Sequence, residues 1–297
     1  MNGIKAGLVK LILRLSALLP LRWVRALGRA AGRVAWWLNS GGRRVTQRNI
    51  DLAFPEKTPD QRRELARRSL QSTAELALEM GHVWLRSWNY VDGLIESVEG
   101  AELVTQALAA GRGVVVLGPH IGNWEVLGLH LATLGPAVSL YEPPHLAGLD
   151  GIVRAARERS GATLVPTDSR GLATLLRCIK RGHIAGILPD QVPRHVNAGE
   201  NVAFMGVRCF TPTLASQMIR RSGAVALFAM ALRSSRGFRI VYFPADDAIY
   251  ADDILQSLSA LNRGVETCVR AAEDQYQWEY KRFKVRPKEG PGAYHDL

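Results

Sequence analysis

A histidine and a glutamate five residues apart follow a short apolar run in the first half of the chain. His120 and Glu125 lie in GPHIGNWE, residues 118–125, directly after Val114-Val115-Val116-Leu117. An imidazole that a carboxylate orients can remove the proton of an alcohol as the alcohol attacks a carbonyl carbon. We therefore take His120 as a candidate general base and Glu125 as the carboxylate that orients it.

The residues around this pair predict a sharp loop between a strand and a helix. Gly118 and Gly122 allow the backbone to turn or to approach a substrate closely. The helix expected from Asn123 would offer free backbone N–H groups to a developing oxyanion, and Asn123 is counted among the candidate substrate-binding residues. The spacing His-x4-Glu is a weak pattern by itself, and a buried histidine bonded to the backbone is the alternative reading.

The elements that must position this loop are short apolar runs that alternate with helical stretches. Strands are predicted at residues 113–118, 137–141, 162–165, 184–188, 224–232 and 238–243. Helices are predicted at residues 123–133, 151–160, 171–181 and 212–221. This alternation indicates an α/β fold with a mixed, mostly parallel sheet flanked by helices, whose catalytic groups collect at the carboxyl edge.

The N-terminal quarter carries the whole basic excess of the chain. Of the formal net charge of +11, residues 1–70 supply 15 Lys+Arg against 4 Asp+Glu. In residues 8–37 a cation recurs every three or four positions among Leu, Val and Trp, which predicts an amphipathic helix in a membrane interface, broken or kinked at Pro20. The uncharged stretches are far shorter than the roughly 20 residues of a membrane span. The alternative is a helix packed on the protein's own core, with Trp36 and Trp37 as core residues.

The expected organisation has three parts. Residues 1–40 are a membrane-associating amphipathic helix, residues 41–100 a basic linker and helical region, and residues 101–297 an α/β catalytic domain. Within the second part, residues 41–57 show no clear period, and Thr58 with Gln61 forms a capping box that begins a helix running to about residue 84. A last helix is predicted at residues 252–276.

Several classes of function are disfavoured by what the chain contains. Three widely spaced cysteines form neither a disulfide framework nor a CxxC site, and a reducing compartment fits them best. A metal site built from His120, Glu125 and His130 is disfavoured because His130 lies about one and a half helical turns beyond Glu125. The basic residues are interleaved with Leu and Ala, without zinc-ligand spacing or an RNA-binding aromatic motif, so no nucleic-acid partner is expected.

The motif and several stretches further along the chain resemble one enzyme family. HIGNWE resembles the His-x4-Asp/Glu motif of glycerolipid-type acyltransferases, and in this form the late, lauroyl- and myristoyl-type acyltransferases of lipid A biosynthesis. The resemblance covers nearly the whole chain, and the further stretches that carry it are NIDLAFP from Asn49, Ser169-Arg170-Gly171, ILPDQVP at 187–193, FMGVRCFTPT at 204–213 and QYQWEYKRFKVRP at 275–287. Cys209 and Met205 depart from the family pattern, so the acyl-chain length does not carry over.

This resemblance implies an enzyme at the cytoplasmic face of a Gram-negative inner membrane. It would move an acyl chain from an acyl carrier protein thioester to a hydroxyl of a lipid A precursor, without a cofactor or a metal. His120 would be the base and Glu125 its partner. Arg170, for a phosphate, and Asp190 and Gln191, in the third motif block, are the further candidates for substrate binding. The same chemistry on another glycolipid or aminolipid, and a non-catalytic membrane-bound scaffold, remain open alternatives.

Overall fold

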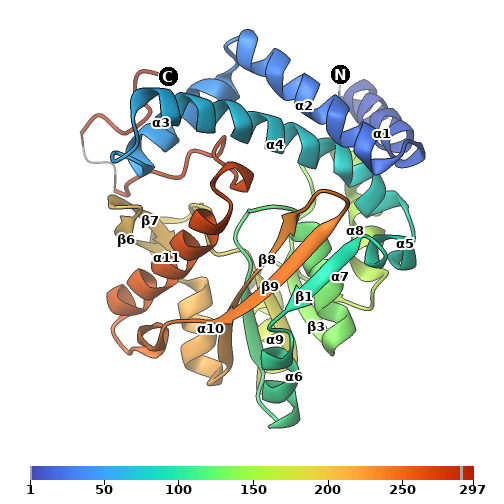
Figure 1. Cartoon of the computed structure of the whole chain (residues 1–297). Helices are drawn as coiled ribbons and strands as arrows, with labels where there is room; N and C mark the ends of the chain where they lie inside the picture. The colour runs from blue at the N-terminus through green and yellow to red at the C-terminus, as the bar shows by residue number, and fades with distance from the viewer. Residues whose placement is uncertain (1, 288–289) are drawn as a thin grey trace.

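A seven-stranded sheet forms the centre of the molecule (Figure 1). The computed structural model describes residues 2–287 and 290–297. In spatial order the strands are β1 (Ile95–Glu99), β9 (Phe238–Pro244), β8 (Val225–Arg233), β2 (Val114–Leu117), β5 (Ile184–Ile187), β3 (Ala137–Tyr141) and β4 (Thr163–Pro166). The last five of these run parallel, β9 is antiparallel to β8, and β1 is parallel to β9. The expected mixed, mostly parallel sheet is confirmed.

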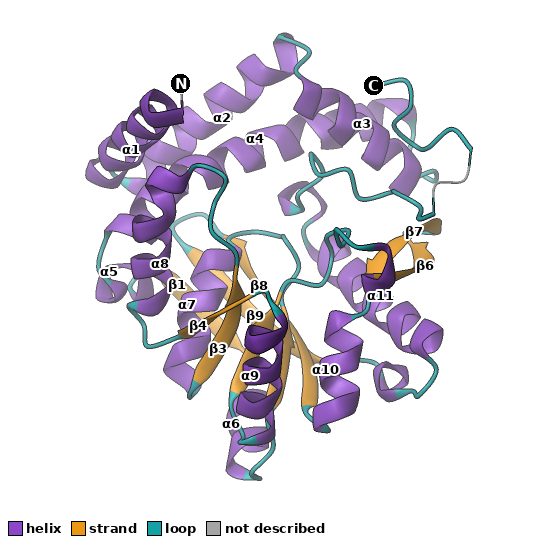
Figure 2. Cartoon of the chain, turned by 180° about the vertical axis from the view of Figure 1, so that it is seen from behind, coloured by secondary structure: helices purple, strands orange, loops and turns teal. Residues whose placement is uncertain are grey.

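Helices cover both faces of this sheet, which explains why its central strand is apolar at every position. On β2, Val114 and Val116 belong to the core under one set of helices, α6 (Glu102–Ala109) and α7 (Trp124–Leu134). Val115 and Leu117 belong to the core under α9 (Ser169–Lys180), α10 (Leu214–Ser222) and α11 (Ile254–Ala271), and Figure 2 shows α9 and α10 on that side. A parallel strand that is buried on both faces reads as a continuous apolar run.

A layer of helices from the N-terminal part crosses the carboxyl edge of the sheet. It consists of α1 (Asn2–Leu18), α2 (Leu21–Trp37), α3 (Gly41–Ala53) and α4 (Pro59–Leu85), drawn across the top of Figure 1. The backbones of α2 and α4 come very close, because a Cβ atom at Gly28 would lie 2.6 Å from the Cα of Glu75 and one at Gly32 would lie 2.4 Å from the Cα of Gln71. Only glycine fits at these two positions.

The remaining elements complete the fold between these layers. Two strands, β6 (Gly199–Phe204) and β7 (Val207–Pro212), form a separate antiparallel hairpin. Short helices are α5 (Trp88–Asp92) and α8 (Asp150–Glu158). Of these elements, the sequence predicted α8 alone; β1 and the β6–β7 hairpin had no expected counterpart.

Most predicted elements lie within about two residues of the observed ones, and two signals near the N-terminus are confirmed in detail. Pro20 separates α1 from α2. At the start of α4, Gln61 N donates to Thr58 Oγ1 at 3.3 Å and Thr58 N donates to Gln61 Oε1 at 2.8 Å, which is a complete capping box.

Two predictions about secondary structure were wrong. Residues 41–57 begin with helix α3, in which Ser40 accepts a hydrogen bond from Arg43 N at 3.2 Å as the cap. Its buried face includes Thr46 and Asn49, and these polar residues hid the helical period from a reading of apolar positions. The last helix, α11, ends at Ala271 rather than Tyr276, and a 3₁₀ helix, η4 (Glu273–Gln275), follows it.

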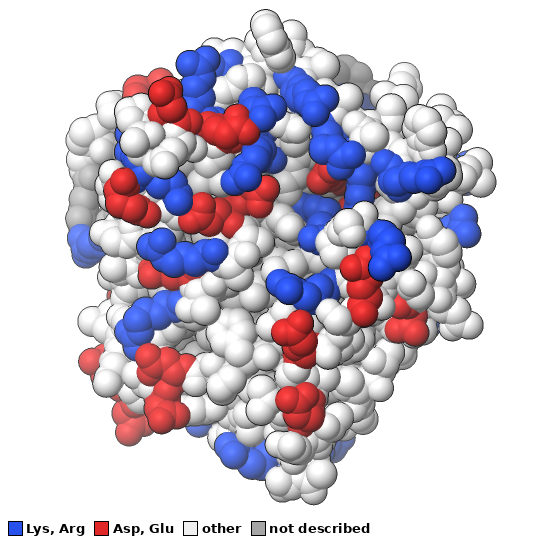
Figure 3. All heavy atoms as spheres, in the orientation of Figure 1, with Lys and Arg blue, Asp and Glu red and all other residues white. Residues whose placement is uncertain are grey.

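The sequence suggested that the cations of α2 all lie on one solvent-facing side, and this is wrong for Arg25. Arg25 is buried, because α2 packs on α4 through the face that carries Val24 and the two close-packed glycines. Trp36 is also buried, whereas Trp37 is 84% exposed. In Figure 3, Lys and Arg gather in the upper half of the face, interleaved with acidic residues.

The N-terminal helices nevertheless expose many large apolar side chains. On α1 these recur at a helical spacing and form a stripe, which we call the α1 stripe: Ile4, Leu8, Leu11, Leu15 and Leu18. Trp23 and Leu27 add to it from α2. Within residues 2–287 and 290–297, every helix is too short or too polar to cross a bilayer.

Candidate active site

Two neighbouring strands deliver a histidine and an aspartate to the same point of the sheet edge. β2 and β5 are parallel and in register, with Leu117 opposite Ile187. His120 lies three residues beyond Leu117, and Asp190 lies three residues beyond Ile187. Because both strands end at the same level, the two side chains meet at the carboxyl edge, where ligands bind in open α/β sheets.

Asp190 holds both the backbone and the ring of His120. Its Oδ2 accepts from the backbone N of His120 at 3.0 Å, and its Oδ1 lies 2.8 Å from the Nδ1 of the ring. Burial alone would raise the pKa of Asp190, but the His120 imidazole and these hydrogen bonds outweigh it and lower the pKa below its usual value. Asp190 is therefore a buried carboxylate that accepts hydrogen bonds only.

The other ring nitrogen of His120, Nε2, is available to accept a proton from a substrate. An ionised Asp190 requires the proton of the neutral ring to lie on Nδ1, so that Nε2 carries the free electron pair. Among the described residues the ring of His120 has a hydrogen-bond partner at Nδ1 and none at Nε2, and the side chain is 11% exposed. The edge of the ring packs against Trp124, with 4.9 Å between the ring centroids. This arrangement suits a general base that a substrate can reach.

Glu125 is not in contact with His120 in the structure, in contrast to the pairing expected from the sequence. Its carboxylate forms a two-pronged ion pair with Arg157 of α8, at 2.5 Å and 3.0 Å. Glu125 lies in the first turn of α7, whereas His120 lies in the loop before it, and Asp190 already occupies Nδ1. Burial alone would lower the pKa of Arg157, but Glu125 outweighs it and raises the pKa.

The loop between His120 and α7 is fixed by backbone contacts. Gly122 has a φ of +60°, and a Cβ atom there would lie 2.1 Å from the carbonyl oxygen of Ala231. Asn123 caps α7 by accepting from Val126 N at 3.3 Å, and its amide nitrogen donates to Glu79 at 3.2 Å. Asn123 is fully buried, and in the structure these contacts make it the cap that positions the loop.

The remaining two candidate residues, Gln191 and Arg170, lie in different places along the carboxyl edge of the sheet. Gln191 follows Asp190 and donates to Gln277 Oε1 at 3.1 Å, so it lies beside the His120 loop. Arg170 is exposed at the start of α9, beyond the last strand of the sheet, β4. In the described part of the chain its side chain forms neither a hydrogen bond nor an ion pair. The structure therefore brings Gln191 next to His120 and leaves Arg170 at the far end of the same edge.

Comparison with known proteins covers nearly the whole chain. The family model described as bacterial lipid A biosynthesis acyltransferase matches residues 4–285. The chain belongs to this family. It is 24% identical to the lipid A biosynthesis lauroyltransferase of Escherichia coli K12 over 95% of this chain and 92% of the relative. For the palmitoleoyltransferase of the same strain the values are 25%, 82% and 79%, and for a lipid A biosynthesis acyltransferase of Haemophilus influenzae they are 25%, 91% and 85%.

In this acyltransferase the C-terminal segment forms part of the site, which no spacing near His120 could indicate. Gln277 N donates to the carbonyl oxygen of His120 at 2.9 Å. Glu279 accepts from Thr73 Oγ1 at 2.9 Å, and burial raises the pKa of Glu279 although the nearby His120 opposes this. Tyr276 is buried beside Asp190. The signal for this segment was the QYQWEYKRF stretch, which indicated the family without indicating the contacts.

A buried charge cluster under the loop was also missed by the sequence analysis. Glu79 of α4 is fully buried and accepts from Arg25 Nε at 2.6 Å, from Asn123 at 3.2 Å and from Arg233 at 3.5 Å. Arg233 also donates to the carbonyl oxygen of Gly122 at 3.0 Å. Glu79 therefore joins α2, α4, the end of β8 and the His120 loop.

Replacing Glu79 by glutamine is expected to destabilise this acyltransferase by about 3 kcal/mol, because two buried guanidinium groups lose their carboxylate. The free energy of unfolding in urea measures the effect. Glu64→Gln is the matched control on the same helix, since its ion pair with Arg67 is exposed and contributes little. Equal stabilities for the two variants would contradict the assignment of Glu79 as the centre of the cluster.

Proposed function

We propose that this acyltransferase moves a fatty acyl chain from an acyl carrier protein thioester to a hydroxyl of a lipid A precursor. The acceptor would be a hydroxyacyl chain that is already attached to a glucosamine disaccharide. The observation that carries the proposal is the His120–Asp190 pair at the carboxyl edge of the sheet, in which Asp190 holds Nδ1 and no described residue bonds to Nε2. Family membership and relatives that are named for fatty acyl transfer support the same reaction class.

In the proposed reaction His120 shuttles one proton. Nε2 takes the proton from the acceptor hydroxyl while the oxygen forms a bond to the thioester carbonyl carbon, and Asp190 stabilises the imidazolium. When the tetrahedral intermediate collapses, the carbon–sulfur bond breaks and the imidazolium returns the proton to the leaving thiolate. Cys209 and Cys268 are buried, and burial raises the pKa of both thiols, which does not suit them to forming an acyl-enzyme.

The other candidate residues receive supporting roles in this proposal. Glu125 is a positioning residue, because its ion pair with Arg157 fixes the first turn of α7, from which Trp124 contacts the His120 ring. Gln191 lines the approach to His120. Arg170 is the candidate for a phosphate of the donor or the acceptor, since its guanidinium is exposed, has no partner among residues 2–287 and 290–297, and matches phosphate geometry.

The test supplies purified protein in detergent with acyl carrier protein thioesters of several chain lengths and the tetraacylated lipid A precursor. Mass spectrometry of the lipid product identifies both the acyl length and the acceptor position. Transfer by the wild type and its loss in a His120 variant are the expected results. If the wild type transfers to another glycolipid and not to the precursor, the acceptor in this proposal is wrong.

We further propose that α1 and α2 lie in the cytoplasmic interface of the inner membrane of a Gram-negative bacterium. The support is the α1 stripe, whose five apolar side chains are 52–81% exposed, together with the basic residues of both helices. An amphiphilic acceptor could then reach the site from the lipid surface.

Replacing Leu11 and Leu15 by glutamate is expected to weaken binding to anionic phospholipid vesicles by at least about tenfold, because burial of two leucines is lost. Co-sedimentation with vesicles measures the binding. Leu255→Glu is the control, since Leu255 is 47% exposed on α11 and lies outside the stripe. Unchanged sedimentation of the double variant would place the membrane contact elsewhere.

A further inference from the structure

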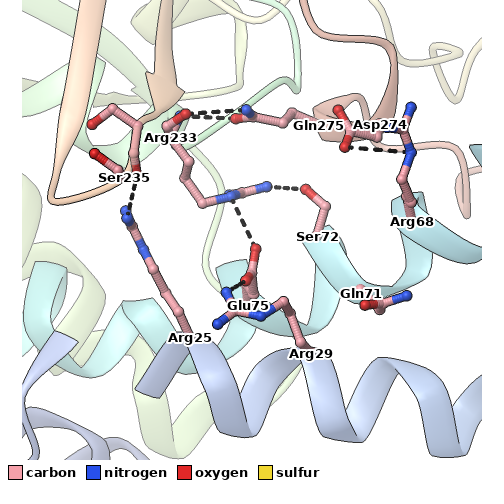
Figure 4. A pocket seen from close by; sticks show the side chains of 11 residues that line it. Arg25, Arg29, Arg68, Gln71, Ser72, Glu75, Arg233, Ser235, Asp274 and Gln275 are labelled. Atoms are coloured by element: carbon pink, nitrogen blue, oxygen red, sulfur yellow. Dashed lines mark hydrogen bonds and ion pairs between the residues drawn. The ribbon is translucent and has the colours of Figure 1, made fainter. Parts of the chain in front are cut away.

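A cavity of about 430 Å³ lies between α2, α4 and the end of β8. Every one of the 11 residues that line it is polar or charged, and Figure 4 shows Arg233 directed at Glu75 and Ser72 and Arg68 directed at Asp274. Sites for apolar ligands are lined mainly by hydrophobic side chains. The polar and charged groups of this lining therefore suit a polar ligand.

The position of the cavity connects it with the site. β8 is the neighbour of β2 on the side opposite to β5, and the two strands run parallel. The carboxyl end of β8, Arg233 followed by Ser234, thus reaches the same edge as His120. Arg233 also donates to the carbonyl oxygen of Gly122, two residues after His120, at 3.0 Å. The wall of the cavity is in direct contact with the His120 loop.

The charge of the lining favours an anion. Four arginines, Arg25, Arg29, Arg68 and Arg233, line the cavity together with two carboxylates, Glu75 and Asp274. Glu79 does not line the cavity but pairs with Arg25 and Arg233, so the formal charge of the group is 4 − 3 = +1. Burial raises the pKa of Glu75 even though the neighbouring arginines oppose this. A phosphate monoester carries about −1.5 to −2 at neutral pH, which complements this excess.

Arg29 and Arg68 have N–H groups that are not used in contacts within the described protein, unlike Arg25 and Arg233. Arg25 and Arg233 are buried and use their N–H groups in contacts within the protein. The side chain of Arg29 is 45% exposed and bonds to Glu75 through Nη1 only. The side chain of Arg68 is 54% exposed, and its ion pair with Asp274 is 4.0 Å long, beyond hydrogen-bond distance. Arg29 and Arg68 therefore stand at the open side with free donors.

We propose that this cavity binds a phosphate monoester on the head group of the acceptor lipid, with Arg29 and Arg68 as the residues that contact it. The inference rests on the proposed function, because it names the part of the acceptor that the cavity would hold. Guanidinium groups suit the purpose, since their paired donors match phosphate oxygens. A phosphate held here places the acceptor on the β8 side of His120 and leaves Arg170, on the β4 side, to the donor.

The test compares Arg29→Gln and Arg68→Gln with the wild type on two acceptors, the phosphorylated precursor and the same lipid after enzymatic removal of its phosphates. Each variant is expected to raise KM for the phosphorylated acceptor about tenfold, with kcat within about twofold, because a charge-assisted hydrogen bond is lost. With the dephosphorylated acceptor the wild type and both variants should share one high KM. Arg67→Gln is the matched control, since Arg67 precedes Arg68 on α4 and pairs with Glu64 outside the cavity.

Three results would overturn the assignment. The wild type could show the same KM for both acceptors, Arg67→Gln could match Arg68→Gln, or the rise in KM could fall on the acyl carrier protein instead. If the wild type acylates neither lipid, the proposed function fails, and binding of the micelle-embedded phosphorylated precursor then tests the cavity by itself. Weaker binding by Arg68→Gln than by Arg67→Gln would support the cavity, and equal binding would refute it.

Discussion

Replacing His120 by glutamine is expected to lower kcat by about 10³-fold while KM for both substrates stays within a fewfold. Glutamine can still donate a hydrogen bond to Asp190, but it cannot take a proton at the position of Nε2. General base catalysis by a positioned side chain contributes about 10² to 10⁴-fold in rate. Steady-state kinetics with a saturating acyl carrier protein thioester measure the loss.

The control for this variant is His183→Gln. His183 precedes β5 at the opposite edge of the sheet, and wild-type kcat is expected after its replacement. A loss confined to kcat assigns His120 to the chemical step, whereas a rise in KM alone would assign it to binding. Full activity of His120→Gln would eliminate the mechanism proposed above.

Replacing Asp190 by asparagine is expected to lower kcat by about 10³-fold and to exceed the effect of Glu125→Gln. Asparagine has the shape of Asp190, but it no longer stabilises the imidazolium and no longer fixes the proton on Nδ1. Glu125 acts on His120 only through Arg157 and the first turn of α7, so about a tenfold loss is expected for Glu125→Gln. The ranking of the two variants under identical conditions is the measurement.

The opposite ranking would have a specific meaning. A larger loss for Glu125→Gln would show that Glu125 leaves Arg157 and contacts His120 during the reaction, as the sequence motif first suggested. Arg157→Gln separates these cases, because it releases Glu125 without removing its carboxylate. If it shares the modest loss of Glu125→Gln, the ion pair is what the reaction requires.

Asp190 also links stability to pH. Its pKa is lower in the folded protein than in the unfolded chain, where it is about 3.9. The carboxylate therefore contributes stability that is present above about pH 4 and is lost as the pH falls through the folded-state value. The difference in unfolding free energy between the wild type and Asp190→Asn should shrink as the pH falls below about pH 4. A constant difference down to pH 3 would contradict the ionised state of Asp190.

The sequence by itself determined the layers of the fold and the place of His120. Apolar runs such as residues 114–117 predicted buried strands, and Pro20 and the Thr58 cap predicted where helices end and begin. These features depend on contacts between residues close in the chain, so the local sequence pattern predicts them. For the same reason His120 was correctly placed at the end of a strand.

Only the tertiary structure decided which groups meet there. Asp190 reaches His120 from 70 residues away because β5 pairs with β2 in register, and spacing within the motif suggested Glu125 instead. Likewise Arg25, expected among the exposed cations of α2, is buried against Glu79 because Gly28 lets α2 approach α4. Strand order and helix packing set these contacts, and neither leaves a pattern in the local sequence.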